Sequence, residues 1–345
     1  MSLKRHAFRN KLVEMLEDMK SLFASKRPDT QGNPARFLTI KDVEILEYTA
    51  LDTKTEVLAQ IDFQSDNGDW KQEILIRQFA LMEDYTQELN LHEQIVDRCS
   101  RFDLVEAALV IHRDDRSMRI MYDLDEAITF FAFRQQTSYI HDLIGKAVAI
   151  LQGVDSYGLD HTNLRELCEF IIQQIPLSPD DKEMVRMLLE PHFPIIDYTP
   201  GGYVPTTLFD PSFVRIKITK MNSYIVYIIP HEPLEPVVDR MTDVAAIYAE
   251  SSYVEFCAFG HVDTTRQLIA RFFKGYNELS GFVHGTPLEK LYPHGITLDL
   301  QMFINFFLLE MTKLSEGIAF KDPITYQYMV FLLTKKPFLL IDLDQ

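Results

Sequence analysis

The order in which strand-like and helix-like segments follow one another constrains the fold of this chain more than any single motif does. Strands are predicted throughout residues 37–79, where apolar and polar side chains alternate, and Ser-Asp-Asn-Gly-Asp at 65–69 predicts a hairpin turn at Asn67-Gly68. The elements predicted after this meander are a helix at 85–99, strands at 105–111 and 118–124, helices at 127–152, 163–175 and 180–189, a hairpin at 213–218 and 224–229, and mainly helix over 241–333. A run of strands followed by a run of helices predicts an α+β protein.

The same order predicts three parts along the chain. Residues 1–36 contain an N-terminal helix, with an apolar stripe over 11–24, and a polar linker. Residues 37–125 are predicted to form an antiparallel β-rich small lobe. Residues 126–345 are predicted to form a mostly helical large lobe with one embedded β-hairpin. We therefore expect a two-lobed protein, long enough at 345 residues to bury its cores without disulfides.

The charge balance excludes some classes of partner. Asp and Glu number 51 against 34 Lys and Arg, which gives a formal net charge of −17. Proteins that bind nucleic acid or anionic lipid neutralise phosphates with basic side chains, so we expect neither a nucleic acid nor a membrane as partner.

The cysteines and the apolar segments indicate in which cellular compartment the protein is expected. The 3 cysteines are odd in number and have no metal-ligand spacing, which favours a reducing compartment. The N-terminus lacks the apolar core of a secretory signal, and the longest apolar stretch, 302–309, is far shorter than a bilayer requires. We expect a soluble, cytoplasmic protein.

The segment around the embedded hairpin carries a resemblance to a known family. Thr-Thr-Leu-Phe-Asp-Pro-Ser-Phe at 206–213 precedes the hairpin, Ile-Pro-His-Glu at 229–232 follows it, and Val-Asp-Arg-Met-Thr-Asp-Val-Ala at 238–245 begins a helix. This arrangement resembles the aminoglycoside phosphotransferase and choline kinase superfamily of the protein-kinase-like fold. In that family the corresponding segments read H-G-D-L-H-P-x-N, I-D-W-E and G-D-P-x-x-D-L-A.

The resemblance implies that the phosphotransfer residues have been lost. It places Leu208 at the catalytic carboxylate, Phe213 at the metal-binding Asn and Pro230 at the metal-binding Asp. Phosphoryl transfer requires a carboxylate to orient the acceptor hydroxyl, and oxygen ligands to hold Mg²⁺. None of these three side chains offers an ionised oxygen, so we expect no catalytic residue, no metal ion and no bound cofactor.

In the predicted small lobe, the resemblance implies a nucleotide-binding cation and a carboxylate that pairs with it. The strand that carries the family's lysine has Arg77, and the following helix offers Glu88 or Glu93 as the pairing carboxylate. The segment 48–55, at the nucleotide loop, contains no glycine, whereas close backbone approach to phosphates favours glycine.

Three hypotheses follow from the sequence. The first is a catalytically inactive kinase-like protein, a pseudokinase, that acts as a binding or regulatory module with an unknown protein partner or as a homodimer. The second is an active small-molecule phosphotransferase in which Asp210 orients the acceptor and Glu232 or Asp239 holds a metal ion. The third is an unrelated α+β structural or interaction protein. The apolar segments 302–309 and 326–333 fit a core or a subunit interface, and the helix at 11–24 is another candidate contact.

Overall fold

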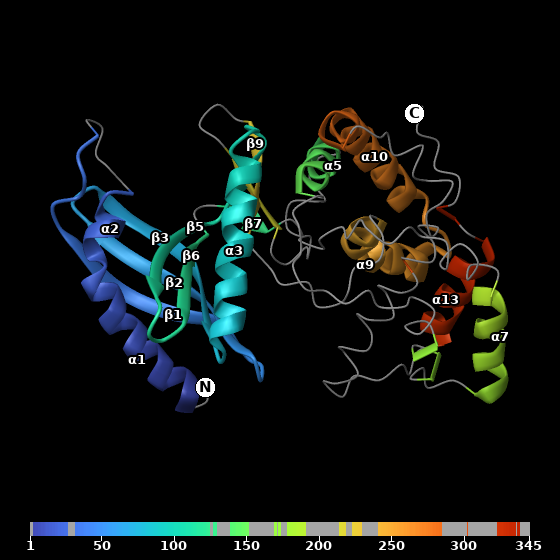
Figure 1. The fold of residues 1–345 in the computed structure, drawn as a ribbon, viewed down its shortest axis with the longest axis horizontal. Helices are drawn as coiled ribbons and strands as arrows, with labels where there is room; N and C mark the ends of the chain where they lie inside the picture. Colours follow the sequence, from blue (N-terminus) through green and yellow to red (C-terminus); the bar gives the residue numbers. More distant parts are fainter. Residues whose placement is uncertain are drawn as a thin grey trace. The chain divides into compact units, whose positions relative to one another are not determined.

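The computed structural model confirms the α+β class (Figure 1). The structure describes residues 3–26, 32–124, 127–129, 139–151, 169–170, 172–173, 178–190, 214–218, 223–229, 241–284, 302, 323–335 and 337–338. Two compact units are present. The first comprises Met1–Glu93 and Ala107–Ala127, and the second comprises Gln94–Glu106 and Ile128–Gln345.

The first unit is built on an antiparallel sheet with the strand order β1-β2-β3-β6-β5. Its strands are β1 (Leu38–Ala50), β2 (Lys54–Ser65), β3 (Gly68–Phe79), β5 (Leu109–Asp114) and β6 (Arg119–Asp123). The predicted meander is therefore confirmed.

The turn between β2 and β3 fixes the register of the two long central strands. Ser65 is opposite Gly68, so the loop consists of Asp66 and Asn67 and lies one residue before the predicted Asn67-Gly68. Gly68 has a φ of +111°, a conformation that glycine adopts without strain. The Ser65 hydroxyl closes the turn, because it accepts a hydrogen bond from the Asn67 N–H at 3.0 Å and donates one to the Gly68 carbonyl at 2.9 Å.

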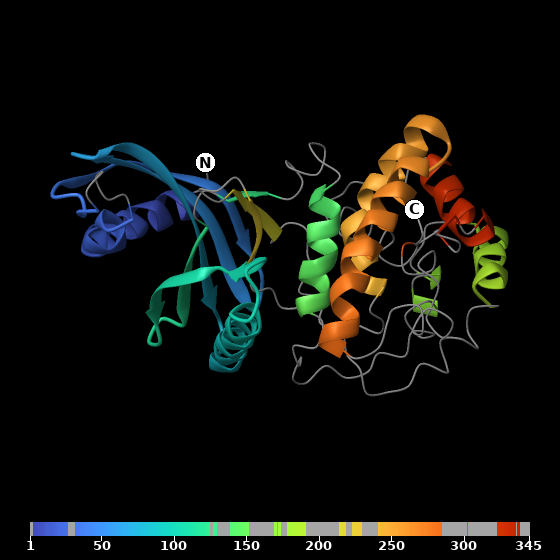
Figure 2. The ribbon, with the colours of Figure 1, turned by 90° about the horizontal axis from the view of Figure 1, so that it is seen from above.

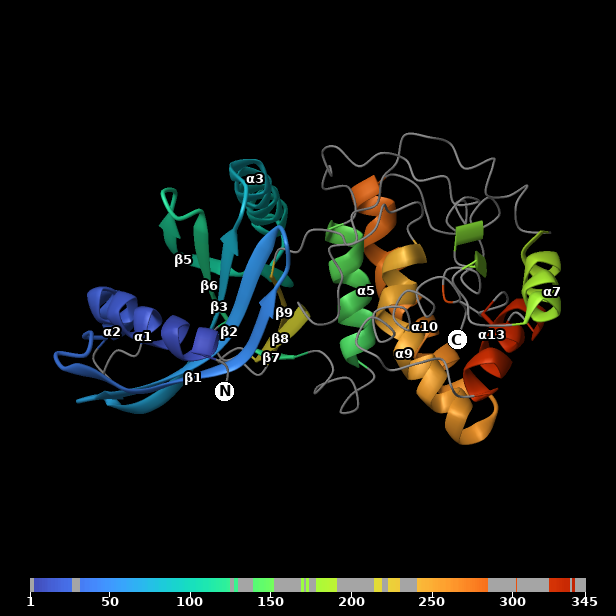
Figure 3. The same cartoon turned by 90° about the horizontal axis from the view of Figure 1, so that it is seen from below.

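One face of this sheet is apolar and is covered by the N-terminal helices α1 (Leu3–Asp18) and α2 (Lys20–Ala24) (Figure 3). Leu12, Leu16 and Phe23 are buried there against alternate residues of the strands, among them Val57, Ala59, Ile61, Phe63, Ile74 and Ile76. Arg9 of α1 ties the helix to β1, since its side chain donates to the Val43 carbonyl at 2.6 Å and to the Asp42 carboxylate at 2.5 Å. The predicted apolar stripe at 11–24 thus packs on its own sheet.

The opposite face of the sheet receives helix α3 (Met82–Cys99), which the sequence predicted at 85–99. The strands run antiparallel, so side chains at paired positions point to the same face. Glu56 is paired with Arg77, and Leu75 with Tyr122. These four side chains therefore lie on the face that α3 covers.

The second unit contains a smaller sheet with the order β4-β9-β8-β7. The predicted hairpin is confirmed as β8 (Val214–Ile218) and β9 (Tyr224–Ile228), with Val214 opposite Ile228. Two predictions need correction here. The segment 105–111 is not one strand, because β4 (Val105–Ala107) joins the smaller sheet while β5 joins the larger one. Residues 128 and 129, predicted as helix, form β7 (Ile128–Thr129), because they pair with β8.

Helices make up most of the described part of the second unit. They are α5 (Tyr139–Leu151), α7 (Pro179–Leu189), α9 (Met241–Phe259), α10 (Asp263–His284) and α13 (Pro323–Lys335). Tyr328 and Leu332 of α13 are buried, as the core interpretation of 326–333 requires, whereas in the apolar segment 302–309 only Met302 is described, and it is buried. Among the described residues, no helix combines the length and the apolar character needed to cross a membrane.

Helices α5 and α10 lie side by side (Figure 2) and touch backbone to backbone. A Cβ atom at Gly145 would lie 2.0 Å from the Phe272 carbonyl oxygen, and one at Gly275 would lie 2.0 Å from the Asp142 carbonyl oxygen. Because backbone atoms cannot yield as side chains do, only glycine fits at these two positions.

We expect Gly275→Ala to lower the melting temperature, although alanine is the better helix former at an open position. Forcing the added methyl group against the α5 backbone should cost about 1–3 kcal/mol of unfolding free energy. Thermal unfolding monitored by circular dichroism measures this loss. Lys274→Ala, at the exposed neighbouring position, is the control and should change little. A Gly275→Ala protein as stable as the parent would contradict this close helix packing.

Candidate functional site

The guanidinium of Arg77 is the centre of the candidate site. Arg77 lies on β3, and its side chain has an exposed fraction of 0%. Its Nε donates to the Glu56 Oε1 of β2 at 2.7 Å, and its Nη1 donates to the Glu88 Oε1 of α3. The sequence-predicted pair of Arg77 and Glu88 is therefore brought together, with Glu56 as a second carboxylate.

Two further side chains complete this group, which we call the Arg77 cluster: Lys54, Glu56, Arg77, Glu88 and Tyr122. The Tyr122 hydroxyl of β6 donates to the Glu88 Oε1 at 2.8 Å, and the Tyr122 ring centroid lies 5.6 Å from the Arg77 guanidinium carbon. The Lys54 Nζ is 3.3 Å from the Glu56 Oε1. Two cations and two carboxylates thus balance one another.

Burial and neighbouring charges shift the pKa of Arg77 in opposite directions. Burial lowers the pKa of Arg77, but the carboxylates of Glu88 and Glu56 outweigh burial and hold that pKa above its usual value. Burial, and then the charge of Glu88, raise the pKa of Tyr122 well above its usual value. Arg77 is therefore a permanent cation, and Tyr122 remains a protonated donor.

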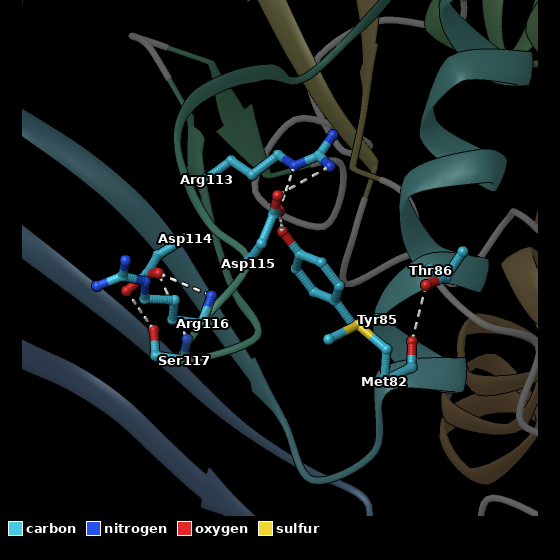
Figure 4. Close-up of polar contacts among 8 residues, drawn as sticks. All are labelled: Met82, Tyr85, Thr86, Arg113, Asp114, Asp115, Arg116 and Ser117. Atoms are coloured by element: carbon cyan, nitrogen blue, oxygen red, sulfur yellow. Dashed lines mark hydrogen bonds and ion pairs between the residues drawn. The ribbon is translucent and has the colours of Figure 1, made fainter.

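The first turn of α3 is fixed to the turn between β5 and β6 (Figure 4). The Tyr85 hydroxyl donates to the Asp115 Oδ1 at 2.5 Å, and the Arg113 Nε donates to the same oxygen at 2.6 Å. Asp114 organises the turn, since it accepts from the Arg116 N–H at 3.0 Å and from the Ser117 hydroxyl at 2.7 Å. Tyr85 is one turn before Glu88 in α3, so this contact helps to position Glu88.

The remaining sequence-predicted residues fall into two groups. Glu93, the alternative pairing carboxylate, is described as part of α3, but Glu88 contacts Arg77. The positions predicted to carry or to have lost the catalytic and metal-binding groups lie outside the described residues: Leu208, Asp210, Phe213, Pro230, Glu232 and Asp239. Their roles stay predictions. Within the described part of the chain, no three His, Cys, Asp or Glu side chains form a group that could hold a metal ion.

Sequence reasoning did not single out Lys54, Glu56 or Tyr122. The predicted turn would not have found Glu56, because a two-residue loop at Asn67-Gly68 pairs Glu56 with Phe79, whereas the actual loop, Asp66 and Asn67, pairs Glu56 with Arg77. Nor did a signal exist for Tyr122, whose strand reaches β3 only after helix α3 and β5.

Comparison with known proteins gives a fold but no close relative. No protein-family model and no curated protein sequence matches the chain. A choline kinase from Streptococcus pneumoniae is similar in structure, with 17% sequence identity and a TM-score of 0.50 over 93% of this chain and 99% of that chain. The chain has the protein-kinase-like fold of that choline kinase. The family resemblance predicted from sequence is thus confirmed at the level of the fold.

Two other solved structures are less similar. A macrolide 2'-phosphotransferase from Brachybacterium faecium is 13% identical, with a TM-score of 0.47 over 86% of this chain and 94% of that chain. An ethanolamine kinase from Plasmodium vivax is 12% identical, with a TM-score of 0.42 over 86% of this chain and 82% of that chain.

Arg77→Met should destabilise the protein by about 3–5 kcal/mol, because it leaves two largely buried carboxylates without their cation. Arg77→Lys should cost less, since a lysine keeps the charge but cannot donate to both carboxylates with the same fixed geometry. Urea unfolding measures both losses. Lys71→Met, at an exposed position of the same strand, is the control and should change the unfolding free energy by less than about 0.5 kcal/mol.

Tyr85→Phe should lower stability at neutral pH by removing the hydrogen bond to Asp115. Burial, and then this hydrogen bond, raise the pKa of Tyr85 to about 12 from the usual 10. The difference in stability between the parent and Tyr85→Phe should therefore be fully present below pH 10 and decline as the pH rises through about 12. Denaturant unfolding at a series of pH values measures it, with Arg116→Ala in the same turn as the control. A difference that does not change over this range would contradict the assignment.

Proposed function

We propose that this chain is a kinase-like protein that does not transfer phosphate and acts by binding or regulating a partner. The observation that carries the proposal is the state of Arg77, a fully buried cation held between the carboxylates of Glu56 and Glu88. The resemblance implies that the cation at this position pairs with nucleotide phosphates. Such pairing requires a cation that an external anion can reach.

The Arg77 cluster does not fit a nucleoside triphosphate. Glu56 adds a negative charge 2.7 Å from the guanidinium Nε, on the cation that phosphate oxygens would have to approach. Like charges at such distances repel strongly where water is excluded. A phosphate group at Arg77 would have to displace Glu56 first.

The connection between β1 and β2 supports the same proposal. The resemblance places the nucleotide loop here, and the connection consists of Leu51, Asp52 and Thr53, without a glycine. It is a tight turn in which the Leu51 N–H donates to the Lys54 carbonyl at 2.8 Å. Backbone N–H groups that cradle phosphates need a more open, glycine-containing loop.

The sequence of the large unit adds the chemical argument. Leu208, Phe213 and Pro230 stand where the resemblance requires a catalytic carboxylate, a metal-binding amide and a metal-binding carboxylate. Leucine, phenylalanine and proline side chains cannot coordinate Mg²⁺ or orient a hydroxyl group. We propose that the partner is another protein or a second copy of this chain, and that the protein works in the cytoplasm.

Titration calorimetry with ATP, with and without Mg²⁺, tests the proposal, and we expect no magnesium-dependent binding. A phosphate-transfer assay should accompany it, with choline, ethanolamine and gentamicin as acceptors, because the solved structures with similarity to this chain include a choline kinase, an ethanolamine kinase and a complex that contains gentamicin. We expect no transfer to any of them. Magnesium-dependent binding with transfer would overturn the proposal. In that event, loss of transfer in Asp210→Ala would identify the active phosphotransferase that the sequence left as an alternative.

A further inference from the structure

We propose that Glu56 is a built-in anion that occupies an oxyanion site formed by Lys54 and Arg77. In this native arrangement the side chain of Glu56 takes the place of a phosphate-type ligand, and its removal opens the site to such a ligand. This inference rests on the proposed function, because it explains how a phosphate-binding position is closed within the chain itself.

The first argument is the position of Glu56 relative to solvent. The exposed fraction of the side chain is 16% for Glu56, 6% for Lys54, 2% for Glu88 and 0% for Arg77. The two carboxylates of the cluster therefore differ in kind. Glu88 is enclosed with Arg77 and Tyr122, whereas Glu56 is the member through which the cluster meets water.

The second argument is the way in which Glu56 is bound. A single oxygen, Oε1, lies 2.7 Å from the Arg77 Nε and 3.3 Å from the Lys54 Nζ. One anionic oxygen shared by a guanidinium and an ammonium is the arrangement by which proteins bind phosphate oxygens. The side chain thus supplies from β2 the contacts that a bound oxyanion would otherwise make.

The third argument is the charge that remains when Glu56 is removed. Of the described carboxylates in the cluster, only Glu88 then remains, paired with Arg77, while Lys54 loses its contact with Glu56, so the described cluster has one positive charge in excess. The place vacated is the solvent-facing one. A small oxyanion such as inorganic phosphate or pyrophosphate fits the vacancy in both charge and hydrogen-bonding character.

Anion rescue of Glu56→Ala in the full-length chain tests this inference. We expect Glu56→Ala to have a lower melting temperature than the parent, and phosphate or pyrophosphate to restore it with a saturable dose dependence. Sodium chloride at the same ionic strength should not restore the melting temperature. Acetate, a carboxylate without the phosphate geometry, should rescue less. Calorimetry should show phosphate binding to Glu56→Ala at least about tenfold tighter than to the parent.

Matched variants separate a binding site from a general charge effect. Glu47→Ala removes an exposed carboxylate from β1 and should show no anion rescue. Glu56→Ala combined with Lys54→Met should lose most of the rescue, because the site then lacks one of its cations. If Glu56→Ala does not fold in the absence of anions, the yield of folded protein after refolding in phosphate provides the same readout. Glu56→Gln keeps the shape of the side chain, so it should fold, and phosphate should raise its melting temperature only weakly.

Two results would overturn the inference: no phosphate effect on Glu56→Ala beyond that on Glu47→Ala, or phosphate binding to the parent as tight as to Glu56→Ala. Neither result depends on whether the parent transfers phosphate from ATP. Failure of this inference and failure of the proposed function are therefore distinguishable.

Discussion

A buried guanidinium requires negative charge beside it, and this requirement organises the first unit. Removing an ion from water costs several kcal/mol even after the protein relaxes, and the cost is recovered only by well-placed opposite charges and hydrogen bonds. Arg77 meets this condition with Glu56 from β2 and Glu88 from α3, and Glu88 is in turn bonded by Tyr122 from β6. Two strands and one helix are thus fixed around one side chain.

The two faces of the larger sheet are stabilised by different physical effects. The face under α1 and α2 is apolar, and burial of side chains such as Leu16, Phe23 and Ile61 drives its packing without directional constraints. The face under α3 depends on oriented charged hydrogen bonds, which tolerate little displacement. Helix α3 is further fixed at its first turn by the contact of Tyr85 with Asp115 (Figure 4). The charges of the Arg77 cluster are held in place by one another, so the cluster needs no bound nucleotide to balance them. This agrees with the proposal that the protein binds a partner and does not transfer phosphate.

Different parts of the site were predictable to different degrees. Arg77 and a carboxylate from the next helix followed from the resemblance, but the sequence left Glu88 and Glu93 open. They are five residues apart, which places them on different sides of a helix, and only the docking of α3 decides which of them faces the sheet. Glu56 was not predictable from the turn, because a loop at Asn67-Gly68 would pair it with Phe79, and only the actual loop at Asp66 and Asn67 pairs it with Arg77. Nor was Tyr122, because its contact with Glu88 joins residues 34 positions apart.

The sequence by itself determined the class of fold, the hairpins and the chemical character of Leu208, Phe213 and Pro230, because alternation, turn propensity and side-chain chemistry are properties of a few neighbouring residues. Tertiary structure alone decided how 105–111 divides between two sheets, why α5 and α10 need glycine where they meet, and which charges surround Arg77. These features depend on partners distant along the chain. Their energies arise from desolvation and close packing, which exist only once the elements have come together.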